Sequence, residues 1–87
     1  MVTTGGGELE VLIGPGVDAG ETLLLVGRRR ADGRVLVRAW PGGAWAREPE
    51  ARERSVADVL REIEGAVRQG RSVRPEVGAV REWLEVR

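Results

Sequence analysis

The sequence predicts an α+β domain: a three- to four-stranded antiparallel sheet, covered on one face by an amphipathic helix, with a short second helix at the carboxyl terminus. Between residues 8 and 40, short runs rich in Leu, Val and Ile are separated by glycine and proline. The pair Asp32-Gly33 stands between two of these runs, which indicates a β-hairpin. Residues 55–67 then carry apolar side chains at helical spacing, and such a helix needs a surface to cover.

The first strand is predicted over Glu8–Ile13, where Leu9, Val11 and Ile13 alternate with other side chains and share one face. Residues 1–7 are polar and end in three glycines, so we expect a flexible tail followed by a single domain over residues 8–87. Gly14 to Gly16 ends the strand, and a turn follows up to Glu21.

The hairpin joins residues 22–30 to residues 34–40, and its register decides which side chains share a face. A two-residue turn at Asp32-Gly33 and a three-residue turn with a left-handed Gly33 are both compatible with the sequence. We prefer the three-residue turn, which pairs Arg30 with Arg34, because it sorts the side chains better. It places Leu23, Leu25, Val35, Val37 and Ala39 on one face, and Leu24, Val26, Leu36 and Trp40 on the other with Arg28, Arg30, Arg34 and Arg38. The first strand is apolar on both faces, so it should be central or covered by a partner.

After Trp40, a Pro-Gly-Gly turn precedes a short edge strand at residues 44–47 and a charged loop at residues 48–54. The main helix begins after Ser55, which is a suitable N-cap with Asp58 in the first turn. Gly70 stands where a left-handed C-cap is expected.

The second helix is expected after a linker at residues 71–74, with Pro75 in its first turn. Its apolar side comprises Val77, Val80 and Leu84, with Trp83 at the margin.

The amino-acid composition argues against several classes of function. The 87 residues include 14 Arg and 14 acidic residues with no net charge, so there is no global preference for nucleic acid or anionic membrane. Cys and His are absent, which removes thiolate chemistry and the commonest metal ligand and general base. Lys, Asn, Phe and Tyr are also missing, as in a protein from a GC-rich genome. No apolar run approaches the length of a membrane span, so we expect a cytoplasmic protein.

Catalysis would depend on carboxylates alone, and none of them has the spacing of a paired site. We therefore expect no enzyme, no cofactor and no metal site. Gly14-Pro15-Gly16 is typical of a phosphate cradle only before a helix, and no helix begins there, so a turn is the better interpretation. The carboxylates considered are Glu8, Glu10, Asp18, Glu21 and Asp58.

One side of the predicted hairpin is rich in arginine. It could bind an RNA or DNA backbone with Trp40 stacking on a base, it could dock an acidic protein, or it could be a solvated face whose arginines pair with carboxylates. The zero net charge and the compositional use of Arg favour the solvated face. The residues of this candidate partner or nucleic-acid face are Arg28, Arg30, Arg34, Arg38 and Trp40.

The order of these elements resembles that of the small HicB-type antitoxins. Residues 55–67 match position by position the helix pattern Thr-Leu-x-Glu-Ala-Leu-x-x-Ile-x-x-Ala-Ile of that family, and Trp40 to Gly43 stands at the place of its proline–glycine turn. Arg54 replaces the glycine that usually precedes the cap. The resemblance covers about residues 22 to 76 and implies a β-β-β-α domain that dimerises or tetramerises and covers a small RNA-cleaving toxin.

The sequence therefore predicts a small non-enzymatic protein-binding module, either an antitoxin-like domain or an oligomeric domain of unassigned activity. The expected partners are a second or further copies of the chain and a small toxin protein. Nucleic-acid binding through the Arg and Trp side chains is the alternative. The expected contacts between copies are Leu24, Val26 and Leu36.

Overall fold

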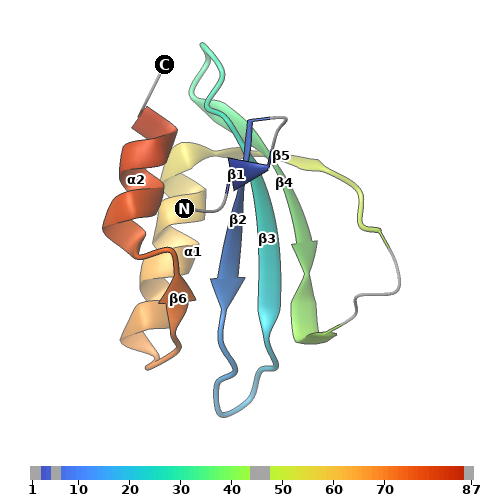
Figure 1. The fold of residues 1–87 in the computed structure, drawn as a ribbon, viewed down its shortest axis with the longest axis vertical. Helices are drawn as coiled ribbons and strands as arrows, with labels where there is room; N and C mark the ends of the chain where they lie inside the picture. The colour runs from blue at the N-terminus through green and yellow to red at the C-terminus, as the bar shows by residue number, and fades with distance from the viewer. Residues whose placement is uncertain (1–2, 5–6, 44–47, 86–87) are drawn as a thin grey trace.

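The computed structural model describes residues 3–4, 7–43 and 48–85. An antiparallel sheet forms one layer, and both helices lie together on one side of it (Figure 1). The predicted α+β class, with a longer helix and a short helix near the carboxyl terminus, is confirmed. The helices are α1 (Val56–Arg68) and α2 (Val77–Glu85).

The three longest strands lie side by side in the order β2, β3, β4 (Figure 1). Two two-residue strands, β1 and β6, pair with opposite ends of the outer edge of β2, whereas β5 forms the other edge of the sheet beside β4. The sheet thus has six strands within the described residues, more than the three or four predicted. The strands are β1 (Thr3–Thr4), β2 (Glu8–Ile13), β3 (Thr22–Gly27), β4 (Arg34–Trp40), β5 (Arg52–Ser55) and β6 (Val73–Arg74).

The additional strands come from segments without a strand pattern. β1 lies within the predicted tail, β5 within the predicted loop 48–54, and β6 within the predicted linker. Main-chain hydrogen bonds hold such edge strands, so an alternating apolar pattern is not required. The strand predicted at residues 44–47 lies outside the described residues.

The turn of the β3–β4 hairpin agrees with the prediction, but the register of the strands does not. Arg30 donates its N–H to the carbonyl of Arg34 at 2.8 Å, and Gly33 has a φ of 78°, as a three-residue turn requires. Farther from the turn, however, Val26 pairs with Val37. Between these two pairings the first strand contains one residue more than β4, as in a β-bulge, and this residue shifts β3 by one position.

The shift reverses the two faces predicted for β3. Leu24 and Val26 lie in the core with exposures of 1% and 0%, while Leu23 and Leu25 lie on the opposite face. The prediction for β4 holds for Val35 and Val37, which are buried.

The core lies between the sheet and the two helices. From β2 it includes Leu9, Val11 and Ile13, which share one face as predicted, and from the helices it includes buried valine, isoleucine, alanine and leucine side chains. The helical members are Val59, Ile63, Ala66, Val80 and Leu84.

The caps of α1 agree with the prediction. Ser55 accepts a hydrogen bond at its Oγ from the N–H of Asp58 at 3.1 Å. Gly70 follows the helix with a φ of 81°, a conformation that a side chain would strain. These local signals define both ends of the helix, which covers the sheet as expected.

The β2–β3 loop (residues 14–21) is attached to the segment after α1. Arg71, which is half-buried, donates hydrogen bonds at 2.8 Å to the carbonyls of Gly14 and Gly20. The N–H of Gly14 also bonds to the carbonyl of Ser72 at 2.7 Å. One guanidinium group therefore connects both ends of the loop to the helical layer.

Candidate functional site

The side of the sheet that faces away from α1 and α2 carries a set of apolar side chains outside the core. We call it the open face. An antiparallel sheet with one face in solvent normally shows polar side chains there, but β3 presents leucines on both faces. The open face comprises Glu8, Glu10, Leu12, Leu23, Leu25, Gly27, Leu36, Arg38 and Trp40.

The strand register arranges the open face in cross-strand rows. One row is apolar and runs from Leu12 through Leu23 to Trp40, all three of which are half-buried. Aligned side chains on neighbouring strands are close enough to form one continuous surface. The row therefore makes a hydrophobic band across β2, β3 and β4.

The next row has opposite charges at its two ends. Glu10 on β2 pairs with Leu25 on β3, and Leu25 pairs with Arg38 on β4. Leu25 is half-buried and lies between a carboxylate and a guanidinium group. This order, acidic then apolar then basic, gives the face a direction across the strands.

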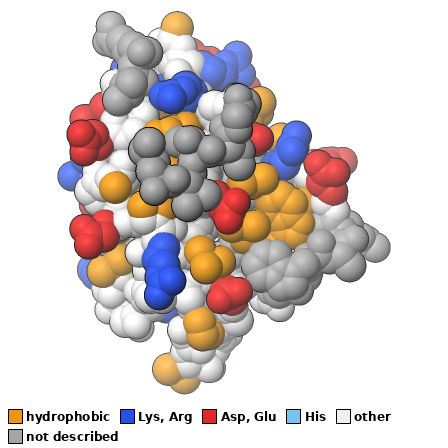
Figure 2. All heavy atoms as spheres, in the orientation of Figure 1, with side chains coloured by type: hydrophobic (Ala, Val, Ile, Leu, Met, Phe, Trp, Pro, Cys, Tyr) orange, Lys and Arg blue, Asp and Glu red, His pale blue; other side chains and the backbone are white. Residues whose placement is uncertain are grey.

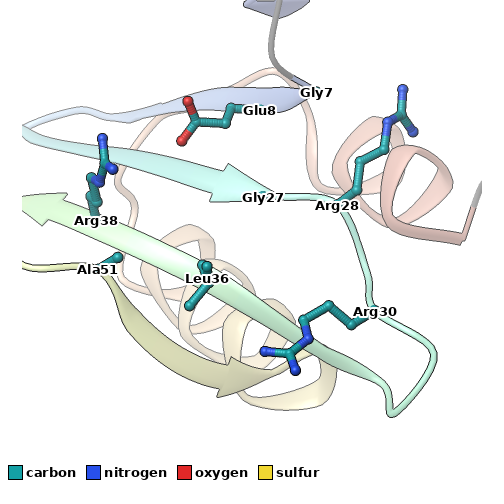
Figure 3. Close-up of a pocket in the computed structure, with 8 residues that line it drawn as sticks. All are labelled: Gly7, Glu8, Gly27, Arg28, Arg30, Leu36, Arg38 and Ala51. Atoms are coloured by element: carbon teal, nitrogen blue, oxygen red, sulfur yellow. The ribbon is translucent and has the colours of Figure 1, made fainter.

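The third row contains a hollow. Gly27 has no side chain to fill the space between Glu8 and Leu36, and a hollow of about 330 Å³ is found there. Figure 3 shows Glu8, Leu36 and Arg38 on the near side of the strands, with the helices behind. Leu36 is 47% exposed, so an apolar side chain borders an accessible depression.

Figure 2 shows a group of hydrophobic side chains right of centre, with acidic and basic side chains beside it. Arg38 pairs with Glu48 at 3.3 Å, and the two side chains are 38% and 74% exposed. An ion pair this exposed contributes little stability and leaves the guanidinium group accessible to another carboxylate.

Three of the predicted arginines, Arg28, Arg30 and Arg38, line the hollow beside Leu36, and the predicted arginines also make contacts with other side chains (Figure 3). Arg30 and Arg34 both contact Glu53 on β5, at 3.0 Å and 3.5 Å. Arg28 instead lies over the ring of Trp83 in α2, 4.8 Å from its centroid, and so helps to attach α2 to the end of β3.

The three predicted contacts between copies separate into two groups. The prediction is wrong for Leu24 and Val26, because both side chains are enclosed in the core. Leu36 lies on the open face and is accessible. The sequence analysis missed Leu25 and Leu23 as surface residues, since the extra residue before Arg30 leaves no signal in the apolar pattern.

Two further hollows lie away from the open face. One of about 580 Å³ is lined by Val37, Arg52 and Arg54 among others, and there Arg54 pairs with Glu62 at 2.7 Å. Another of about 450 Å³ adjoins the β2–β3 loop and Arg71. The first is also lined by two carboxylates, Glu50 and Glu62, and the second by Asp18.

The described residues contain no group of three or more His, Cys, Asp or Glu side chains arranged to hold a metal ion. None of the helices over residues 56–68 and 77–85 is long and apolar enough to cross a membrane.

Fold and surface together define a small α+β domain with an antiparallel sheet, two helices on one face and an amphipathic open face on the other. Comparison of the chain with protein-family models, with curated proteins and with solved structures found no match.

Proposed function

We propose that this chain is a small non-enzymatic protein-binding module that works through the open face of its sheet. The observation that supports the proposal is the band of Leu12, Leu23 and Trp40, continued by Leu25 and Leu36, on a sheet face that both helices leave uncovered. A contiguous apolar patch surrounded by charged side chains is typical of a surface that binds another protein. The first partner that we propose is a second copy of the chain.

Self-association also suits a domain of this size. An 87-residue chain buries a smaller share of its surface than a larger domain, and an interface adds apolar burial. The free edge of the sheet at β5 is a poorer candidate for the interface than the open face. The charged side chains of Arg52, Glu53 and Arg54 disfavour pairing of this edge with another strand.

The resemblance to HicB-type antitoxins suggests a further partner, a small RNA-cleaving toxin. We propose that the assembled copies would bind such a toxin with surface that remains outside the interface between them. The test is co-purification of this chain with the product of an adjacent gene for a small protein, followed by assay of its ribonuclease activity with and without the chain. Stable binding with unchanged ribonuclease activity, or no binding, would contradict this part of the proposal.

The open face is tested by measuring molar mass as a function of concentration, by light scattering, for two matched variants. Leu36 on the open face and Val67 on α1 are 47% and 48% exposed, so each can be changed to Arg at a similar cost to the fold. We expect Leu36→Arg to abolish association and Val67→Arg to leave it intact. A wild-type chain that stays monomeric at millimolar concentration would contradict the proposal.

Nucleic-acid binding is the alternative, and phosphates would then have to displace the present partners of the predicted arginines. Arg30, Arg34 and Arg38 each contact a carboxylate, and Arg28 stacks on Trp83. A titration with single-stranded RNA at low salt tests it, since binding through arginines would weaken steeply as salt is added.

A further inference from the structure

We propose that the second copy docks face to face on the open face, related to the first by a twofold axis that runs parallel to the strands above β3. This inference rests on the proposed function and adds to it the geometry and the pairing of charges. It is carried by the order of side chains in the row of Glu10, Leu25 and Arg38.

A twofold axis parallel to the strands keeps each row at its level but exchanges its two ends. The β2 side of one copy then lies over the β4 side of the other, so Glu10 faces Arg38 of the second copy. The same symmetry brings Arg38 over Glu10 of the second copy, which makes two ion pairs. Leu25 is near the axis and meets Leu25 of the second copy, so apolar contact lies between the two pairs.

The other simple arrangement has the axis across the strands, and the charges disfavour it. An axis across the strands at the level of this row would keep β2 over β2, so that Glu10 would face Glu10 of the second copy and Arg38 would face Arg38 of the second copy. Like charges brought together at an interface are strongly unfavourable. The arrangement of charges therefore selects one orientation, allowing for the rotation of about 30° that sheet twist imposes between packed sheets.

The remaining rows are compatible with the parallel axis. In the apolar row, Leu12 of each copy lies over Trp40 of the other, and apolar atoms are buried on both sides. In the third row, the same exchange places Leu36 of each copy over Glu8 of the other, beside Gly27 and the hollow of about 330 Å³.

The open face is small, so the dimer should dissociate on dilution. Three strands about 4.8 Å apart and about 20 Å long present only a few hundred Å² per copy. That is below the ~800 Å² per partner of a standard interface, as expected for a weak, reversible dimer. Association should therefore be measured from micromolar to millimolar concentration.

The experiment uses charge reversal at the two ends of the middle row. In Glu10→Arg, the axis parallel to the strands places two arginines opposite each other at both ion-pair positions, and in Arg38→Glu it places two glutamates there. We expect each variant alone to dimerise at least about tenfold more weakly than the wild type. An equimolar mixture should form a heterodimer with near wild-type affinity, because every opposing pair is then of opposite charge. The double variant Glu10→Arg/Arg38→Glu should also regain dimerisation.

Matched charge reversals on the helical side serve as controls. Glu82→Arg and Arg61→Glu change exposed residues of α2 and α1, and we expect no effect on the dimer. Circular dichroism establishes that each variant is folded. Glu10→Gln and Arg38→Gln provide milder variants, which should weaken the dimer and reduce its dependence on salt.

The outcomes separate this inference from the proposed function. If the wild type dimerises and Leu36→Arg prevents it, but mixing the two reversed variants restores nothing, the open face is the interface and the axis is wrong. If charge reversal at residues 10 and 38 has no effect on dimerisation, the pairing is wrong. A wild type that never associates overturns both proposals.

Discussion

The strand register predicts that two adjacent leucines of β3 differ sharply in their contribution to stability. Leu24 is 1% exposed in the core, whereas Leu25 is half-buried on the open face. Leu24→Ala removes apolar contacts and leaves a cavity, which typically costs about 2.7–5 kcal/mol. Leu25→Ala in the monomer loses part of the transfer free energy of one side chain, about 1 kcal/mol.

These costs are measured as the free energy of unfolding in urea and as the melting temperature by circular dichroism. For a domain of this size, a loss of 1 kcal/mol lowers the melting temperature by about 4–8 °C, so Leu24→Ala should lower it by at least ~10 °C. The samples must be dilute enough to be monomeric, because binding of a second copy stabilises the folded state. Leu25→Ala should then be the milder variant.

Equal losses for the two variants, or a greater loss for Leu25→Ala, would refute the register. A greater loss for Leu25→Ala would mean that the pairing of Arg30 with Arg34 continues along the hairpin without an additional residue. The open face would then lose Leu25, and the geometry proposed for the dimer would fail with it.

Three other predictions concern single contacts. Ser55→Ala removes the cap of α1 and should lower the free energy of unfolding, measured in urea, by about 1 kcal/mol. Ser55→Thr keeps a hydroxyl group and should retain most of the stability that the cap provides. Equal stability of Ser55→Ala and the wild type would exclude the cap. Gly70→Ala should destabilise the domain by about 1–2 kcal/mol, because residue 70 has a φ of 81°. Gly78 lies in α2 with open space around it, so Gly78→Ala should stabilise the domain by up to about 1 kcal/mol. Melting temperatures that shift in the same direction for both variants would contradict this. Arg71→Ala should increase amide hydrogen exchange in the β2–β3 loop, while Arg68→Ala should not, and unchanged exchange in Arg71→Ala would mean that the two carbonyl contacts do not hold the loop.

Features determined by a few neighbouring residues could be predicted from the sequence. The cap at Ser55, the glycines at positions 33 and 70, and the apolar stripe of α1 all follow from spacing within one element. Each depends on the backbone geometry of a single turn or helix, which the local sequence determines. The fold class follows from the order of these elements.

The face of β3 could not be predicted, because it depends on a residue inserted between two correct local features. Both the turn at Gly33 and the apolar runs are as expected, yet the residue inserted before Arg30 exchanges Leu24 with Leu25. A strand that is apolar on both sides gives no pattern from which to detect the shift. The predicted contact Leu36 on β4 therefore lies on the open face, whereas on β3 the predicted Leu24 and Val26 lie in the core and Leu25 takes their place on the open face.

The edge strands were missed for a different reason. The strand β5, which is charged at residues 52–54, pairs with β4 through its main chain, and Val73–Arg74 extend the sheet through two residues only. Their side chains contribute little to the choice of strand over loop. Arg30 and Arg34 consequently meet Glu53, a contact that requires β5 to be in place.

The most direct test of the central claim, that the open face binds a second copy, is an intermolecular nuclear Overhauser effect. A sample is mixed from isotope-labelled and unlabelled chains at millimolar concentration. Within one chain, Leu12 and Trp40 are separated by the width of β3, but across the proposed interface they are in contact. We predict intermolecular effects between the Leu12 methyl groups and the Trp40 indole. Intermolecular effects at Val67 on α1 instead, or none at any concentration, would contradict the account.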